Sequence, residues 1–424
     1  MKNCLSDKRY LFIVIFLSAF LLRLIYNYSL FINENNALLT DSGNYIHLAK
    51  SLYKDFQFPS VLRTPGYPFF IALIWWISHT QSIISVFLFQ IILDSLTTVL
   101  VAMSGGFFST TNGFNKMGAI LYALNPLAIY YSGKIMSETL FIFLLALSLL
   151  LIKKMLTQEN SRPGVCGASL AAGSAILTRP VAIGFYLLLF FFLLGKTGAK
   201  GRITLLKSVL IVSVLLMAWM CRNANKYHYF TLSTAGNYNL YVFGQNSYAS
   251  AHQSSLPGVK EHFRQQLENK AKNAMGWRET SSARNLGLKL INENKIAFLK
   301  TFLLGTVKTT FQPPWGISQL NRMIFKGRYK VEEGNDATNL NFYSFLNFPY
   351  LRRLLQLPVY GILLWFYGLF YMIVLYFYGL KKIFKLPAFS TRLAYLSCII
   401  FFLASPGSIG FSRFRLPGEF LIVS

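Results

Sequence analysis

The chain has 424 residues, 54% of them hydrophobic, and a mean hydropathy of +0.44, which excludes an ordinary soluble enzyme. Lysine and arginine total 41 against 15 acidic residues, so the formal net charge is +26. No basic and aromatic motif of a nucleic-acid-binding module accompanies this charge, so we expect no nucleic-acid partner and assign it to cytoplasmic loops and anionic lipid headgroups.

Several apolar runs approach the roughly 20 residues needed to cross about 30 Å of hydrocarbon. The clearest are Leu11–Ile32, Ser82–Met103, Leu140–Ile152, Ile203–Met220, Leu357–Leu380 and Ala388–Ala404. The sequence therefore predicts an all-α polytopic membrane protein whose partners include membrane lipids. Scattered cysteines and histidines such as His47 and His79 lack metal-ligand spacing, so we expect no required cofactor and no metal site, with a divalent metal as the unsupported alternative.

The first predicted span places a polar loop, residues 33–64, outside the membrane. Basic residues near the N-terminus hold that end in the cytoplasm, and the apolar run lacks a cleavage site, so we expect an uncleaved first span. Within the loop, Asp41–Lys54 has apolar residues three or four apart and predicts an amphipathic helix. Thr40 is the candidate N-cap, which would leave Asp41 at the positive end of the helix dipole.

The segment Pro65–Ser78 decides the topology. It is too short for a span, so we interpret it as a re-entrant or tilted half-helix. Ser82–Met103 then runs inward and Met117–Ser132 returns outward, which places Glu138 on the side of Asp41. Positive-inside counting fits this scheme over seven crossings.

Three regions follow from this scheme. Residues 1–221 form an N-terminal transmembrane catalytic module, in which a hairpin turns outside at Thr178-Arg179-Pro180. Residues 222–295 form an extracytoplasmic loop, with Val259–Met275 expected to be helical. Residues 296–424 form a C-terminal transmembrane part, and because the last residues begin another apolar run, we expect this part to be truncated.

Four segments taken together resemble a known family. They are Asp41-x-x-x-Tyr45 followed by Arg63-Thr64-Pro65-Gly66-Tyr67-Pro68; Asn125-Pro126 with Tyr130-Tyr131 and Ser137-Glu138; Leu177-Thr178-Arg179-Pro180; and Arg413-Phe414-Arg415-Leu416-Pro417. This combination is similar to the GT-C class of polyprenyl-phosphate-sugar-dependent glycosyltransferases, in the branch related to protein O-mannosyltransferases and the lipid A aminoarabinose transferase. The resemblance implies a GT-C-like transmembrane helix bundle with an amphipathic first outer loop and a mostly helical outer loop.

The resemblance also implies roles for individual residues. Asp41 matches the catalytic aspartate of the family's first outer loop, although many relatives carry a second carboxylate where this chain has Ser42. The implied donor is a polyprenyl-phosphate-linked sugar, and the acceptor a protein, a lipid or a glycan. Tyr45, Tyr67 and Tyr131 are the expected substrate-lining residues.

Chemistry supports this assignment, because a sugar phosphate already has a good leaving group. The site needs a base for the acceptor, for which Asp41 and then Glu138 are the candidates, and positive charge for the departing phosphate. Basic residues on the outer side, where positive-inside statistics would not place them, can supply it. The candidates are Arg63, Lys134, Arg179, Arg413 and Arg415.

Each candidate also has a structural interpretation. Asp41 could only cap its helix, and Glu138 could only neutralise Lys134, four residues earlier. The arginines could anchor lipid headgroups. Asp94, in the middle of a span, favours hydrogen bonds between helices over proton transfer.

We predict an inverting glycosyltransferase in a bacterial inner membrane, with its active site facing outward. The main alternative is a transporter or flippase of polyprenyl-linked sugars, and a glycan polymerase is a second alternative. A transporter should show broken helices in two corresponding halves, and the sequence has no such symmetry.

Overall fold

The computed structural model describes residues 2–39, 41–104, 114–157, 162–270, 281–312, 359–386, 388–409 and 412–424, and every regular element within them is a helix. Two compact units share the chain. Unit 1 comprises Met1–Leu232, Leu375–Ile399 and Leu416–Ser424, and unit 2 comprises Ser233–Val374 and Ile400–Arg415.

Apolar helices confirm the predicted class. Four are long and apolar enough to cross a membrane: α5 (Ile83–Ser104), Glu138–Leu156 within α8 (Glu138–Thr157), α11 (Ala199–Tyr227) and α20 (Val359–Lys385). Shorter apolar stretches lie in α1 (Lys2–Tyr26), α4 (Gly66–Ser78), α9 (Arg162–Thr178), α10 (Ala182–Lys196) and α21 (Phe389–Ala404). The chain is an all-α polytopic membrane protein.

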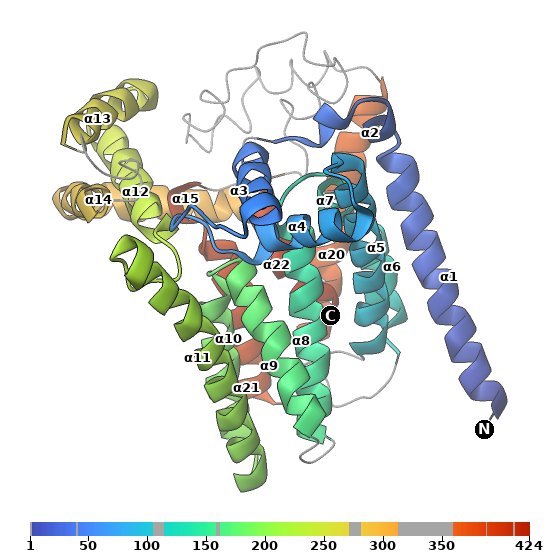
Figure 1. Ribbon diagram of the computed structural model, residues 1–424. Coiled ribbons are helices and arrows are strands. Elements are labelled where there is room, and N and C mark those ends of the chain that lie inside the picture. The colour runs from blue at the N-terminus through green and yellow to red at the C-terminus, as the bar shows by residue number, and fades with distance from the viewer. Residues whose placement is uncertain are drawn as a thin grey trace. The chain divides into compact units, whose positions relative to one another are not determined.

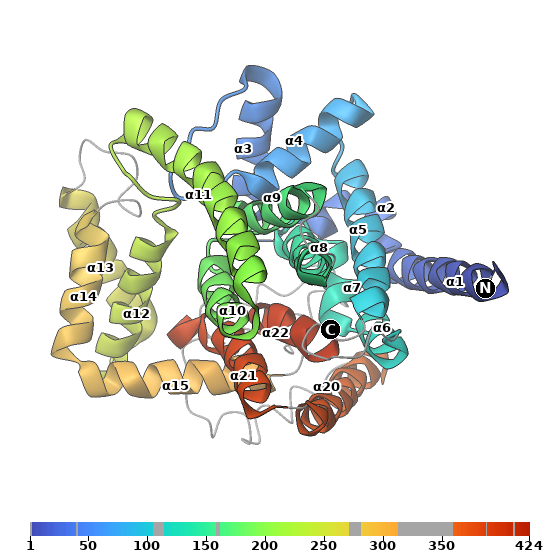
Figure 2. The same ribbon diagram turned by 90° about the horizontal axis from the view of Figure 1, so that it is seen from below.

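Unit 1 is built on a row of packed helices. α5 packs against α1 and α8, and α9 packs against α8 and α11, as Figures 1 and 2 show. Small residues allow the close approach that membrane helices need, since lipid offers no hydrophobic drive to bring them together. A Cβ placed at Gly173 of α9 would lie only 2.5 Å from the Leu215 side chain of α11.

Short elements gather at one end of this row. They are α2 (Ser29–Ile32), the 3-10 helix η1 (Glu34–Ala37), α3 (Ser42–Asp55), α4 and α7 (Pro126–Ser132), and Figure 1 shows α3, α4 and α7 together. The amphipathic pattern of the first outer loop is confirmed, because Tyr45, Leu48 and Ala49, the predicted apolar face, are buried in α3. Thr40, the expected N-cap, lies outside the described residues, and Asp41 occupies the N-cap position.

The expected return span Met117–Ser132 is interrupted. It consists of α6 (Lys116–Ala123) and α7, separated at Asn125, whose side chain caps α7 by accepting from the amides of Leu127 and Ala128. Pro126 has no amide to donate and is therefore well placed in the first turn. The direction of the segment agrees with the prediction, because the Asn115 amide donates to Ala102 near the end of α5 and Gln90, near its start, donates to the Ser132 carbonyl.

A buried ion pair joins three helices of unit 1. Arg23 of α1 donates through Nε to Asp94 of α5 at 2.5 Å, and the Tyr122 hydroxyl of α6 donates to the other Asp94 oxygen at 2.7 Å. Both charged side chains are almost fully buried, at 0% and 2% exposure. Asp94 therefore does bond between helices, as expected, but one of its partners is a charged residue, because Arg23 lies within the first apolar run.

Unit 2 contains α12 (Ala235–Ala251), α13 (Leu256–Lys270), α14 (Ser281–Glu293), α15 (Lys295–Phe311) and part of α20 and α21. Tyr241, Val259, Phe263 and Leu290 belong to its buried apolar cluster, and α12 lies along α14 (Figure 2). The expected helix Val259–Met275 corresponds to α13, although residues 271–275 lie outside the described part.

The last described helix, α22 (Leu416–Val423), belongs to unit 1 and packs on α6 and α8. Its first turn carries Glu419, which is fully buried and accepts from Asn125 Nδ2 at 2.8 Å. The residue that separates α6 from α7 therefore also ties α22 to the bundle.

Candidate active site

Asp41, directly before α3, and Arg63, in the loop between α3 and α4, form an ion pair. Arg63 Nη2 donates to Asp41 Oδ1 at 2.8 Å, and the two side chains are 25% and 26% exposed. Asp41 makes no side-chain capping bond although it occupies the N-cap of α3. Its carboxylate is therefore directed to Arg63 and not to the helix it precedes.

Aromatic rings pack against this ion pair. The Arg63 guanidinium lies 5.1 Å from the Tyr45 ring centroid, and Tyr45 packs edge-on against Tyr67 at 4.9 Å. Tyr67 is fully buried, and its hydroxyl donates to Gln90 Oε1 at 2.6 Å. Of the three predicted substrate-lining tyrosines, Tyr45 thus contacts Arg63 and Tyr67 packs behind Tyr45.

Glu138 and Arg179 form a second ion pair. Arg179 Nη1 lies 3.0 Å from Glu138 Oε1, with side-chain exposures of 17% and 1%. Glu138 is the first residue of α8, where the helix dipole favours a negative charge, and Arg179 directly follows α9. The interpretation of Glu138 as a partner of Lys134 was wrong, because Lys134 lies in a turn and its ammonium group donates to the Asn36 carbonyl instead.

Lys134 is held between backbone and ring. Its Nζ donates to Asn36 at 2.5 Å and lies 4.9 Å from the Tyr130 ring centroid. Burial lowers the pKa of Lys134 to about 8, because the ammonium group has lost most of its water. Tyr131, the third expected lining residue, is 3% exposed and packs edge-on against Tyr130.

Backbone contacts bring the two ion pairs to the same end of unit 1. The Thr64 hydroxyl donates to the Thr178 carbonyl at 3.3 Å, so the residues that follow Arg63 and precede Arg179 are in contact. A Cβ at Gly66 would lie 2.7 Å from the Leu177 carbonyl, which explains a glycine there. The structure thus unites Asp41, Arg63, Glu138 and Arg179, which lie far apart in the sequence.

Two polar residues that were not among the site candidates organise this end. Gln90 of α5 accepts from Tyr67 and donates to the carbonyls of Ser132 and Lys134. Ser42, fully buried, donates to the Ile135 carbonyl at 2.8 Å and fixes the start of α3 against the turn before Glu138. The sequence held a signal for Gln90, because it is a polar residue inside the predicted apolar span Ser82–Met103.

The remaining two candidates belong to unit 2. Arg415 is fully buried and donates through Nη1 to the carbonyls of Thr309, Thr310 and Gln312, which terminate α15. This is the contact of a helix C-capping cation. The Arg413 guanidinium lies 4.7 Å from the Phe414 ring centroid.

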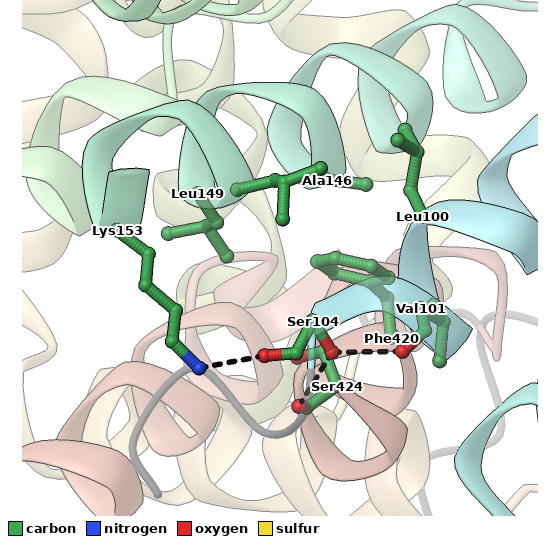
Figure 3. Close-up of a pocket in the computed structure, with 9 residues that line it drawn as sticks. Leu100, Val101, Ser104, Ala146, Leu149, Lys153, Phe420 and Ser424 are labelled. Atoms are coloured by element: carbon green, nitrogen blue, oxygen red, sulfur yellow. Dashed lines mark hydrogen bonds between the residues drawn. The ribbon is translucent and has the colours of Figure 1, made fainter. Parts of the chain in front are cut away.

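A cavity lies at the opposite end of α5 and α8. Its lining includes Ser104, Leu149, Lys153 and Phe420, and Lys153 Nζ donates to the Ser104 carbonyl at 2.9 Å (Figure 3). Gln90 and Ser104 are separated by 14 residues of α5, which corresponds to about 21 Å along the helix axis. The mostly apolar cavity is therefore remote from the two ion pairs.

The described residues contain no group of three or more histidine, cysteine or acidic side chains placed to hold a metal ion. What this end of unit 1 offers is two carboxylates, two guanidinium groups and one ammonium group. Guanidinium groups bind phosphate oxygens in a fork geometry, and a partly exposed carboxylate can accept a proton. Such groups can provide a base for an attacking group and positive charge for a departing phosphate.

Comparison with known proteins found one family model that matches part of the chain. Residues 62–222 match the model of a family described as dolichyl-phosphate-mannose-protein mannosyltransferase. The matched segment, less than half of the chain, includes Arg63, Lys134, Glu138 and Arg179 and excludes Asp41. A search of curated proteins found no match. The family match fits a GT-C-type glycosyltransferase and confirms the predicted resemblance to that class.

Proposed function

We propose that the chain transfers a sugar from a polyprenyl-phosphate donor to an acceptor on the extracytoplasmic face of the membrane. The observation that carries the proposal is the contact that joins the Asp41–Arg63 pair to the Glu138–Arg179 pair at one end of the bundle. The family match over residues 62–222 supports a polyprenyl-phosphate sugar as the donor class.

In the proposed reaction the acceptor hydroxyl or amine attacks the anomeric carbon, and its proton passes to Asp41. The bond between that carbon and the phosphate oxygen breaks, and the electron pair stays on the phosphate. Direct displacement inverts the anomeric centre. Arg63, with Lys134 and Arg179, stabilises the charge that develops on the departing phosphate.

The Asp41–Arg63 pair gives donor binding a second effect. Phosphate oxygens compete with the Asp41 carboxylate for the Arg63 fork, so donor entry loosens the pair and releases the carboxylate for proton transfer. The pair is a quarter exposed, so this exchange does not require a deeply buried charge to lose its partner.

The extracytoplasmic placement is supported by the basic residues at the other end. Lys153, Lys154, Lys196 and Arg202 lie at the ends of α8 and α10 and the start of α11, on the side away from Asp41. Such an excess of lysine and arginine is typical of cytoplasmic loops.

The test is Asp41→Asn with Asp55→Asn as the matched control, because Asp55 is an exposed aspartate at the other end of the same helix. We expect Asp41→Asn to lower sugar transfer from polyprenyl-phosphate mannose by about 10²- to 10⁴-fold. Binding of that donor should remain, since the arginines are intact. In a deletion strain, wild type and Asp55→Asn should restore the missing envelope sugar. Wild-type transfer by Asp41→Asn would contradict the proposal, and lost translocation of the lipid-linked sugar would favour a transporter.

A further inference from the structure

The loop that carries Arg63 is non-helical. α3 ends at Asp55, its C-cap Phe56 adopts a left-handed conformation with φ of 53°, and the chain stays non-helical until α4 begins. Within this loop the Ser60 hydroxyl accepts from the amides of Leu62 and Arg63 at 3.1 and 3.4 Å. The backbone position of Arg63 therefore depends on what holds residues 58–60, as well as on the Thr64–Thr178 bond on its other side.

Arg222, near the end of α11, holds these residues. It donates through Nη2 to the Phe58 carbonyl and through Nη1 to the Ser60 carbonyl. Its guanidinium also lies 5.6 Å from the Phe58 ring centroid. Arg222 thus contacts the loop through two backbone carbonyls and one aromatic side chain.

The guanidinium is itself fixed on α11. It lies 4.8 Å from the Trp219 ring centroid and 5.0 Å from that of Tyr227, and Nη1 donates to Asn223 Oδ1 at 2.8 Å. Tyr227 adds a hydroxyl bond to the Phe58 carbonyl at 3.0 Å. Only an arginine provides both a fork of donors and a flat face for stacking, so lysine cannot replace it here.

We propose that Arg222 is a positioning residue for Arg63. It ties the loop to the 29-residue helix α11, so that the Arg63 guanidinium is held opposite Asp41 before the donor arrives. Pre-organised contacts of this kind reduce the ordering cost of binding. The inference rests on the proposed function, because it assigns Arg63 to the donor phosphate.

The first experiment is a double-mutant cycle between Arg222→Ala and Arg63→Ala, with the KM for polyprenyl-phosphate mannose as the readout. Each single variant should raise this KM by about 10- to 100-fold. If Arg222 acts through Arg63, the double variant should be no worse than Arg63→Ala alone. Effects that multiply fully in the double variant, or an unchanged KM in Arg222→Ala, would overturn the proposal.

Two further variants control for misfolding. Arg202→Ala removes an exposed arginine near the other end of α11, which donates only to carbonyls of Leu194 and Thr197, and it should leave the KM unchanged. Tyr227→Phe removes a single hydroxyl from the Phe58 carbonyl and should raise the KM by a smaller factor than Arg222→Ala. A Tyr227→Phe effect larger than that of Arg222→Ala would contradict the assignment.

A readout without turnover separates this inference from the proposed function. In a background with the four cysteines replaced by alanine, a spin label at Gln57→Cys, an exposed loop position, reports the mobility of the loop. Added Arg222→Ala should mobilise the label, and added Arg202→Ala should not. An immobile label in Arg222→Ala disproves the positioning role, whereas a mobile label with an inactive wild type disproves only the sugar transfer.

Discussion

At the scale of single residues, the two ion pairs differ in how accessible their carboxylates are. Asp41 is 26% exposed and Glu138 is 1% exposed, although each faces one arginine. A proton acceptor must reach the acceptor substrate, whereas a buried carboxylate serves better to orient its arginine. This difference favours Asp41 over Glu138 as the base and leaves Glu138 to hold Arg179.

Lys134 gives the site a testable pH dependence. Its pKa is lowered to about 8 by burial, so its positive charge is present below that pH and lost above it. If the charge helps to hold the donor phosphate, the affinity for polyprenyl-phosphate mannose should fall as the pH rises from 7 to 9. Lys134→Arg keeps its charge over this range and should flatten the profile.

Stability should respond with the opposite sign. Between the folded pKa of about 8 and the ordinary value of 10.5, the unfolded chain binds more protons at Lys134 than the folded chain. The free energy of unfolding contributed by this group therefore rises with pH across that window. For the affinity prediction, a donor affinity that does not change with pH in wild type would show that Lys134 does not contact the phosphate.

The candidate site residues could be picked out from the sequence, but their pairing could not. Asp41, Arg63, Glu138 and Arg179 were selected from the family resemblance together with residue type and the expected side of the membrane. Which cation meets which carboxylate depends on tertiary contacts such as that between Thr64 and Thr178, which no local rule predicts. The spacing rule that joined Lys134 to Glu138 failed because it holds within a helix, and α8 begins only at Glu138.

At the scale of helices, the Arg23–Asp94–Tyr122 cluster joins α1, α5 and α6. Arg23 also donates to the carbonyls of Ala19, Ala123 and Tyr122, so the charge is hydrogen-bonded on several sides. A cluster this well satisfied specifies which faces of the three helices meet.

We predict that Asp94→Asn lowers the free energy of unfolding by about 3–5 kcal/mol, because it leaves the buried Arg23 charge without a counter-charge. The double variant Arg23→Met with Asp94→Leu should recover most of that loss, since apolar side chains of similar size replace both charges. Thermal unfolding in detergent measures both effects, and exposed Asp55→Asn is the control. A double variant as unstable as Asp94→Asn would show that the helices need the ion pair itself.

Helix boundaries were predictable where apolarity decides them and not where polar contacts do. The interruption at Asn125-Pro126 was missed because the flanking residues are apolar on both sides, although an Asn-Pro pair is a helix-start signal. α11 was expected to end at Met220 but continues to Tyr227, because Arg222, Asn223 and Tyr227 find partners in segments that adjoin the helix.

At the scale of the whole molecule, the proposed function requires the Asp41 end of unit 1 to face outward. Asn44 is exposed on α3, and Lys196 is exposed at the end of α10, which starts beside Arg179 and runs 15 residues, or about 22 Å, away from it. Cysteines placed at these two positions report the two sides of the membrane.

In the cysteine-free background, Asn44→Cys should react with a membrane-impermeant maleimide in intact spheroplasts, and Lys196→Cys should react only after the membrane is disrupted. The Ser42–Ile135 bond already requires α3 and the start of α8 to share one side, so α4 cannot separate them. Labelling of Lys196→Cys alone in intact spheroplasts would place Asp41 in the cytoplasm. The lysine-rich loops at the other end would then face outward, against the positive-inside rule. The geometry of the two ion pairs would survive that result, but the extracytoplasmic reaction would not.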